Sequence, residues 1–192
     1  MAGDVERMVR IIAGSARGLR IKTVPSEGTK PTLDRVKEPM FSILTGEIEG
    51  RLVLDLFSGN GSLGLEALSR GAAYAYMNDY DRHCCSVIKE NLVYTRLQSQ
   101  AEVTQLDYRE ALNRHGKAGR KFGLVLLDPP YGDGLIPDVL TRISQLQLWE
   151  SGCVAMCEHV RTDVLPETVG VFVKEKERAY GTVGLTLYRA GE

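Results

Sequence analysis

The sequence predicts an α/β fold: a doubly wound, mostly parallel sheet with helices on both faces. Between residues 52 and 157, five apolar strand segments alternate with helical segments, which is the pattern of consecutive βαβ units. The chain has 192 residues, of which 43% are apolar and 26% charged, as expected of one globular domain. No apolar run approaches the ~20 residues of a membrane-spanning helix, and no secretory signal opens the chain. We therefore expect a cytoplasmic protein without a membrane partner.

The first expected elements form an N-terminal extension. Residues 10–24 contain two short strands around a glycine-bounded turn, which predicts a β-hairpin. Thr32 is a candidate N-cap for a helix that runs to about Leu44, and Pro39 should kink that helix or delay its start. Residues 7–37 hold eight basic and only two acidic residues, although the net charge of the chain is −1. Such asymmetry is typical of an arm that binds a polyanion, and a solvated hairpin without a partner is the alternative.

The remaining elements follow from the spacing of apolar residues. The expected strands cover residues 52–54, 73–77, 102–105, 124–127 and 154–157, followed by an antiparallel pair at 171–179 and 183–188. The expected helices cover residues 62–69, 82–97, 108–114 and 135–146. Ligands of such sheets bind outside the carboxyl ends of the parallel strands, so the chemistry should lie at those ends.

A glycine-rich loop follows the first of these strands. Gly59, Gly61 and Gly64 match the G-x-G-x-x-G pattern, and an acid, Asp79, lies twenty residues after Gly59. Taken alone, this satisfies the fingerprint of dinucleotide-binding proteins. However, four residues that begin with Asp55 separate the strand from the first glycine, and a carboxylate at the strand tip would repel a pyrophosphate. A cationic ligand with an amino group suits this position better, and S-adenosylmethionine is such a ligand.

Further acids follow the next two strands. Asp79 can accept hydrogen bonds from both ribose hydroxyls of the cofactor, and Asp81 is a rival for this contact. Asp107 can accept from the adenine amino group, or it can simply cap the helix that follows. Tyr108 is expected to pack on the adenine ring. The expected cofactor-binding residues are thus Asp55, Phe57, Ser58, Gly59, Gly61, Asp79, Asp107 and Tyr108.

The most specific signal is Asp128-Pro129-Pro130-Tyr131, which follows the apolar strand at residues 124–127. A residue before proline is held extended, and the two prolines stiffen the turn and leave carbonyl oxygens as acceptors. Tyr131 offers a flat face on which a base can stack, worth roughly 1–3 kcal/mol. A plain Pro-Pro turn after a strand is the alternative.

This motif suits methyl transfer to an amino group on an aromatic ring. Such an amine is a poor nucleophile because its lone pair is delocalised. If the Asp128 carboxylate and the Pro129 carbonyl accept its two N–H groups, the nitrogen becomes pyramidal and its lone pair points at the methyl group of a sulfonium. Catalysis then comes mainly from positioning and electrostatics, and no strong general base is required.

Longer stretches carry a family resemblance. They read RIIAG at 10–14, RG at 17–18, PT at 31–32, DRVKE at 34–38, LDLFSGNG at 54–61 and GLEALSRGA at 64–72. With residues 128–131, which look like the [DNS]-P-P-[YFW] motif of amino-methyltransferases, these stretches resemble the RsmD family. Its members are bacterial methyltransferases that act on N2 of one guanine in 16S ribosomal RNA. The match keeps the same order over nearly the whole chain.

The resemblance implies a Rossmann-like class I methyltransferase fold with a seven-stranded, mostly parallel sheet and a small N-terminal β-hairpin. It implies 16S rRNA in the small ribosomal subunit, or an assembly intermediate of it, as the partner. Residues 1–50 would contact the RNA, and residues 51–192 would form the methyltransferase part. The expected phosphate contacts are Arg10, Arg17, Lys30, Arg35 and Lys37. Lys30 stands where the family usually has arginine, which weakens a bidentate contact.

The cysteines and histidines show no metal-ligand spacing, so no metal is expected. A monomer is the default expectation. Three other functions are alternatives to the one that the family resemblance implies. An adenine N6 methyltransferase acting on DNA or RNA can use the same motif, and a non-catalytic RNA-binding assembly factor could retain the fold. A dehydrogenase ranks last because it needs no Asp-Pro-Pro-Tyr element.

Overall fold

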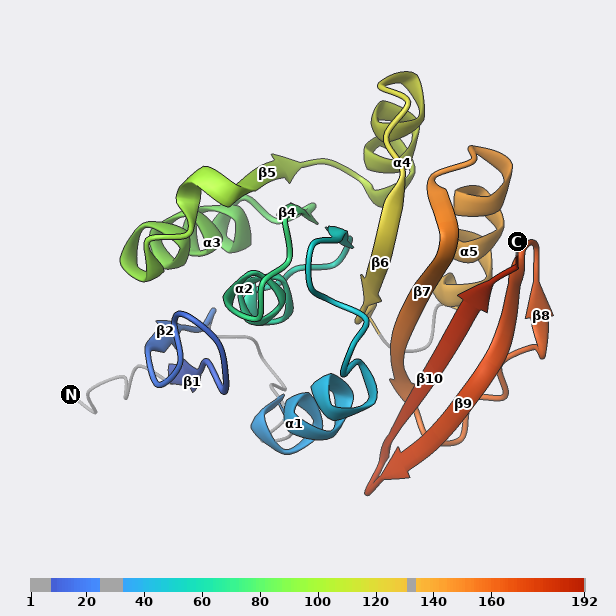
Figure 1. Ribbon diagram of the computed structural model, residues 1–192, viewed down its shortest axis with the longest axis horizontal. Coiled ribbons are helices and arrows are strands. Elements are labelled where there is room, and N and C mark those ends of the chain that lie inside the picture. The colour runs from blue at the N-terminus through green and yellow to red at the C-terminus, as the bar shows by residue number, and fades with distance from the viewer. Residues whose placement is uncertain (1–7, 25–32, 131–133, 192) are drawn as a thin grey trace.

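An eight-stranded sheet forms the centre of the molecule, and the computed structural model describes residues 8–24, 33–130 and 134–191 (Figure 1). In spatial order the strands are β5 (Ala101–Gln105), β4 (Tyr74–Asp79), β3 (Leu52–Asp55), β6 (Phe122–Leu127), β7 (Trp149–Val160), β10 (Val183–Ala190), β9 (Phe172–Tyr180) and β8 (Thr168–Val169). Pairing from β5 to β7 is parallel, and from β7 to β8 it is antiparallel. The predicted α/β sheet is confirmed, with the two-residue β8 as an eighth strand at its edge.

Helices cover both faces of this sheet, as predicted. They are α1 (Leu33–Ile43), α2 (Ser62–Ser69), α3 (Arg82–Thr95), α4 (Tyr108–Lys117) and α5 (Leu135–Gln145), with a short 3-10 turn at Gln98–Gln100. Successive strand residues face opposite sides. Leu124 and Leu126 of β6 therefore join the core under α1, α2 and α3, whereas Val125 and Leu127 join the core under α4 and α5. None of the described helices has the length and apolar character needed to cross a membrane.

The N-terminal hairpin lies against α2, where Figure 1 shows it in blue beside that helix. Its strands β1 (Met8–Arg10) and β2 (Arg20–Lys22) are antiparallel, with Val9 opposite Ile21, and both of these side chains are buried in the core. A Cβ on Gly14 would lie 1.6 Å from the carbonyl oxygen of Ser69, and Gly14 has φ of +84°. Only glycine fits there, so the hairpin loop packs directly on the end of α2.

Pro39 does not delay the start of α1, contrary to one of the two expectations. The helix begins at Leu33 and continues through Pro39 to Ile43. The missing N–H of Pro39 removes one hydrogen bond. Burial of Val36, Met40 and Phe41 in the shared core supplies apolar packing that holds this helix in place. The expected N-cap, Thr32, lies outside the described residues.

Candidate active site

The carboxyl ends of three neighbouring parallel strands, β4, β3 and β6, lie along one edge of the sheet. Asp55 ends β3, Asp79 ends β4, and Asp128 follows β6 directly. Asp55 pairs in register with Leu126 of β6. Asp128 therefore lies two residues further along the strand direction than Asp55. The predicted cofactor acids and the predicted catalytic acid are thus gathered at neighbouring strand ends.

The glycine loop between β3 and α2 is held from two sides. Gly59 N donates to Asp79 Oδ2 at 2.8 Å, and Gly61 N donates to Ser58 O at 2.7 Å. Ser58 Oγ donates in turn to Asp55 O at 2.7 Å. Gly59 has φ of +54° and open space where a Cβ would be. The loop therefore presents bare backbone over which a ligand can lie.

Asp55 lies beneath this loop with only 1% of its surface exposed. Its Oδ2 accepts from Gly64 N at 2.9 Å, while Oδ1 has no hydrogen-bond partner among the described residues. Burial raises the pKa of Asp55 to about 7, against the opposing effect of the hydrogen bonds from Gly64 and Ser58. A cationic group near Oδ1 would favour the charged carboxylate. Asp55 Oδ1, which has no partner among the described residues, therefore fits a cationic cofactor.

Asp79 and Asp81 have different roles. Asp79 accepts from Gly59 N through Oδ2 and from Asp81 N through Oδ1 at 2.9 Å, and burial is the main cause of its raised pKa. The Asp81 side chain caps α3 by accepting from His83 N at 2.6 Å. Asp79 is therefore the acid that touches the glycine loop, and its contact with a ribose stays a prediction.

Asp107 caps α4, which is the alternative that the sequence left open. Its Oδ1 accepts from Arg109 N at 2.9 Å, and its side chain is exposed. Tyr108 is buried and donates from its hydroxyl to Asp138 Oδ2 at 2.8 Å. The Arg109 guanidinium lies 4.6 Å from the centre of the Tyr108 ring, on which adenine was expected to pack.

Phe57 is the more exposed of the two aromatic residues that were expected to contact the cofactor. It is partly exposed, and its ring centre lies 5.7 Å from that of Tyr108. Because Tyr108 is buried, Phe57 provides the accessible ring of this aromatic pair. The contact of either ring with adenine stays a prediction.

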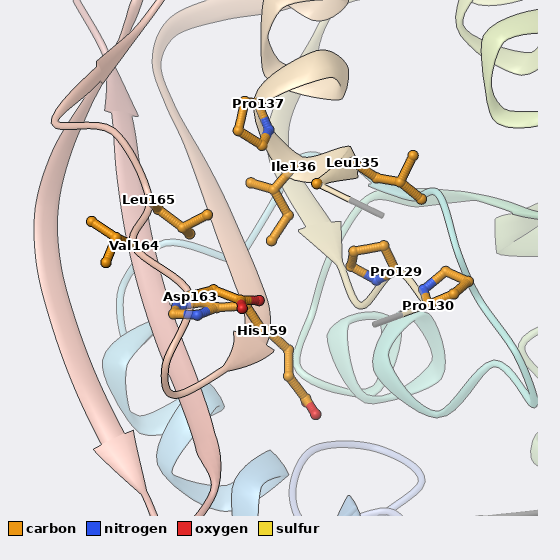
Figure 2. A pocket seen from close by; sticks show the side chains of 11 residues that line it. Pro129, Pro130, Leu135, Ile136, Pro137, His159, Asp163, Val164 and Leu165 are labelled. Carbon is orange, nitrogen blue, oxygen red and sulfur yellow. The ribbon is translucent and has the colours of Figure 1, made fainter. Parts of the chain in front are cut away.

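The Asp-Pro-Pro segment borders a pocket of about 320 Å³. Asp128 is partly buried, Pro129 is buried and Pro130 is exposed, while Tyr131 lies outside the described residues. Figure 2 shows Pro129 and Pro130 on one side of the pocket and Val164 and Leu165 on the other. Two of the four predicted catalytic residues thus line a cavity at the end of β6.

The basic residues of segment 7–37 differ in their exposure to solvent. Arg10 and Arg17 are exposed on the hairpin and its loop, Arg35 falls within α1, and Lys30 lies outside the described residues. Lys37 is only 1% exposed, and its Nζ lies 3.3 Å from Glu66 Oε2. The prediction that Lys37 contacts RNA is therefore wrong, because an ion pair inside the protein occupies this charge.

Sequence reasoning missed three residues near the site. Glu66 accepts from the backbone of Ile12 at 2.8 Å and of Ala13 at 3.1 Å, and so fixes the hairpin to α2. Glu158 and His159 line the pocket beside the prolines. Glu158 directly follows the predicted strand at residues 154–157, just as Asp55 and Asp128 follow theirs, and this position could have drawn attention to it. No group of three or more metal-binding side chains occurs within the described ranges.

The chain is similar to known proteins along nearly its whole length. Residues 9–189 match the model of a family described as "Conserved hypothetical protein 95". A Bacillus subtilis protein named "Putative rRNA methyltransferase YlbH" is 37% identical over 94% of this chain and 98% of its own length. A Haemophilus influenzae protein named "Ribosomal RNA small subunit methyltransferase D" is 34% identical over 94% and 93%.

A solved structure agrees with these matches. The structure titled "Putative methyltransferase yhhF from Escherichia coli" superimposes with a TM-score of 0.83 at 28% identity, covering 96% of this chain and 99% of the other. The Rossmann-like class I methyltransferase fold, with its small N-terminal hairpin, is thereby confirmed.

Proposed function

Because the chain belongs to the family described as Conserved hypothetical protein 95, the RsmD family, we propose that it methylates N2 of one guanine in 16S ribosomal RNA of the small subunit. The observation that carries the proposal is the position of Asp128-Pro129-Pro130. This segment follows β6, with the glycine loop and its acids at β3 and β4 on one side and a pocket toward β7 on the other. A methyl donor and an acceptor base can therefore meet at Asp128.

S-adenosylmethionine fits the glycine loop as the proposed cofactor. The bare backbone at Gly59 leaves room for it, and the orphaned Asp55 Oδ1 offers negative charge to a cationic ligand. When bound, this cofactor supplies an electrophilic methyl group on a positively charged sulfur, and it leaves as neutral S-adenosylhomocysteine once the carbon–sulfur bond breaks. Asp79, which holds Gly59, would position the loop against the ribose.

The chain's own groups would prepare the acceptor. The Asp128 carboxylate and the Pro129 carbonyl accept the two N–H groups of the guanine amino group, so that the lone pair is free to form the new carbon–nitrogen bond. The nitrogen then loses one proton, which Asp128 can pass to water. The hydrogen bonds that Asp128 and Pro129 accept become stronger as the nitrogen becomes positive. In comparable sites, each such bond contributes roughly 10²–10³-fold to the reaction rate.

The exposed cations of the hairpin would bind the RNA. Arg10 and Arg17 lie on the surface and can contact phosphates, which fixes register rather than reading sequence. We propose residues 1–50 as the RNA-contacting part and residues 51–192 as the methyltransferase part. The target base would be splayed out of the RNA to reach Asp128. The reaction would take place in the cytoplasm, with the enzyme acting as a monomer.

A labelling experiment tests the proposal. The protein is mixed with labelled S-adenosylmethionine and hypomethylated small ribosomal subunits, and the RNA is digested to nucleosides for mass spectrometry. Label in N2-methylguanosine at one mapped nucleotide is the expected result. Label in N6-methyladenosine would keep the chemistry and reject the guanine assignment. Absence of label despite measured cofactor binding would favour another substrate or a non-catalytic assembly factor.

A further inference from the structure

The pocket at the end of β6 lies on the side away from the cofactor loop. The sheet order places β4 and β3, which carry the loop and its acids, before β6, and β7 after it. Pro129 and Pro130, which follow β6, border the pocket together with Ile136 of α5 and His159 of β7. Glu158 lies at the pocket edge, and strand alternation places its side chain on the opposite sheet face, with that of its partner Leu185. A base whose amino group sits at Asp128 would therefore extend its ring toward β7.

Glu158 is the acid that β7 brings to this position. Leu127 pairs with Cys157 in parallel register, so the next residue on each strand, Asp128 and Glu158, lie side by side. Glu158 is only 6% exposed and pairs across the antiparallel side with Leu185, a core residue. A carboxylate held in a fixed strand, next to the catalytic acid, is well placed to contact the edge of a base.

The other polar side chains that line the described part of the pocket are less suited to this contact. His159 Nδ1 lies 2.9 Å from Val160 O, and Nε2 lies 2.8 Å from Thr186 Oγ1, so both ring nitrogens are already engaged within the protein. Asp163 is exposed at the pocket rim. A carboxylate has about four acceptor sites, so Glu158 can keep a contact within the chain and still accept from a ligand.

Resting on the function proposed above, we propose that Glu158 selects guanine over adenine by accepting the N1–H of the target base. Guanine carries N1–H next to its amino group, so one carboxylate at Asp128 and one at Glu158 match two neighbouring donors. Adenine carries a bare N1 lone pair next to its amino group, which would face the Glu158 carboxylate without a proton between them. Sites that bind an N–H group in this way reject analogues without it by up to ~10⁴-fold.

The test compares two bases that differ at N1 and in the group at C6, and the Glu158 variant isolates the effect of N1. Small subunits are reconstituted around 16S rRNA that carries either guanine or 2,6-diaminopurine at the nucleotide mapped by the labelling experiment. 2,6-Diaminopurine keeps the exocyclic N2 amino group but has a lone pair at N1. We expect the wild-type protein to favour guanine by at least ~100-fold in kcat/KM. Glu158→Gln should narrow this preference to below ~10-fold, because an amide N–H can donate to the N1 lone pair.

Asp163→Asn is the matched control, since it removes a carboxylate from the rim of the same pocket and should keep the wild-type preference. Equal cofactor affinity of all three proteins verifies that each is folded. Two outcomes would overturn the Glu158 assignment while the proposed function stands: wild-type protein that methylates N2 of both bases equally, or a Glu158→Gln variant that slows on both with an unchanged ratio. Wild-type label in N6-methyladenosine would overturn both proposals.

Discussion

Lys37 Nζ lies 3.3 Å from Glu66 Oε2, and both side chains are closed off from solvent. Lys37 also donates to the carbonyl of Arg10 at 2.6 Å and to Ser62 Oγ at 3.2 Å. Glu66 in turn accepts from the hairpin backbone and from Arg70 Nε. One buried ion pair therefore joins the hairpin, α1 and α2, and α2 begins directly after the glycine loop.

Removing one partner of this pair should destabilise the protein strongly. Lys37→Met removes the buried cation from Glu66, whose carboxylate keeps only the partly exposed Arg70 as a cation among the described residues, and we expect a loss of about 3 kcal/mol in the free energy of unfolding. Urea unfolding followed by circular dichroism measures it. Lys89→Met, at an exposed position of α3, is the control and should change stability by less than ~0.5 kcal/mol. A similar small effect for both variants would show that Lys37 is not structurally important.

Asp55 should make stability depend on pH. Because burial raises its folded-state pKa to about 7, from an ordinary value of 3.8, the folded protein holds this proton more tightly than the unfolded chain does. The group therefore lowers stability progressively as pH rises from about 4 to about 7, and the full cost is present above pH 7. Asp55→Asn abolishes this titration, so the Tm of the variant minus that of wild type should increase between pH 5 and pH 8.

The same variant tests the proposed cofactor contact. At pH 8 the charged carboxylate attracts a cationic ligand, so Asp55→Asn should weaken S-adenosylmethionine binding in calorimetry. Wild-type affinity should decline as the pH falls below 7, and the affinity of the variant should stay nearly constant. Parallel pH profiles for the two proteins would contradict an electrostatic role for Asp55.

Substitutions of Asp79 and Asp81 should affect different properties: cofactor binding for Asp79, and the cap of helix α3 for Asp81. Asp79→Ala releases Gly59 from the end of β4, and we expect at least ~10-fold weaker cofactor binding from the loss of loop position. Asp81→Ala removes the α3 cap, which should cost about 1 kcal/mol of stability. The Asp81 variant should bind the cofactor within ~3-fold of wild type, since its side chain does not hold the loop. The reverse order of affinities would make Asp81 the cofactor residue.

Asp128→Ala should affect turnover without affecting cofactor binding. Asp128 follows β6, whereas the glycine loop follows β3, so the substitution leaves the loop intact. We expect kcat to fall by roughly 10²–10³-fold. Single-turnover rates with labelled cofactor and small subunits measure this, and calorimetry measures the affinity. Equal losses in turnover and in affinity would remove Asp128 from its proposed role.

Arg17 and Lys37 should differ in the salt dependence of RNA binding. Arg17 is exposed on the hairpin loop, so Arg17→Ala should reduce the slope of log affinity against log salt concentration by about one. Lys37 is buried and pairs with Glu66, so a folded Lys37 variant should keep the wild-type slope. Binding of small subunits over a range of salt concentrations gives both slopes.

The spacing of apolar residues predicted the fold well because each strand and helix buries side chains at regular intervals. Leu124 to Leu127 are wholly apolar, and the segment lies at the centre of the sheet with a core on each side. The strand β8 has only two residues, so it carries no periodic signal, and its position depends on pairing with β9. Pro39 shows the limit of local rules, since tertiary packing keeps α1 helical through it.

The sequence predicted those parts of the candidate site that consist of residues close together in the chain. The acids at the strand ends and the Asp-Pro-Pro segment are defined by their neighbours, so their positions follow from the sheet. Lys37 was misassigned because a count of charges cannot show that Glu66, on another helix, neutralises one of them. Glu158 was missed because its significance depends on the register between β6 and β7, which no single segment encodes.

The order of strands along the carboxyl edge has a kinetic consequence. The loop at β3 and β4 and the pocket beside β7 lie on opposite flanks of β6, so either ligand can arrive or depart without crossing the path of the other. In the proposed reaction the methyl group would pass directly between two molecules bound at once, and no side chain would have to carry it. Initial rates at varied concentrations of both substrates should accordingly give intersecting lines, the pattern of a ternary-complex mechanism rather than of a relay through the enzyme.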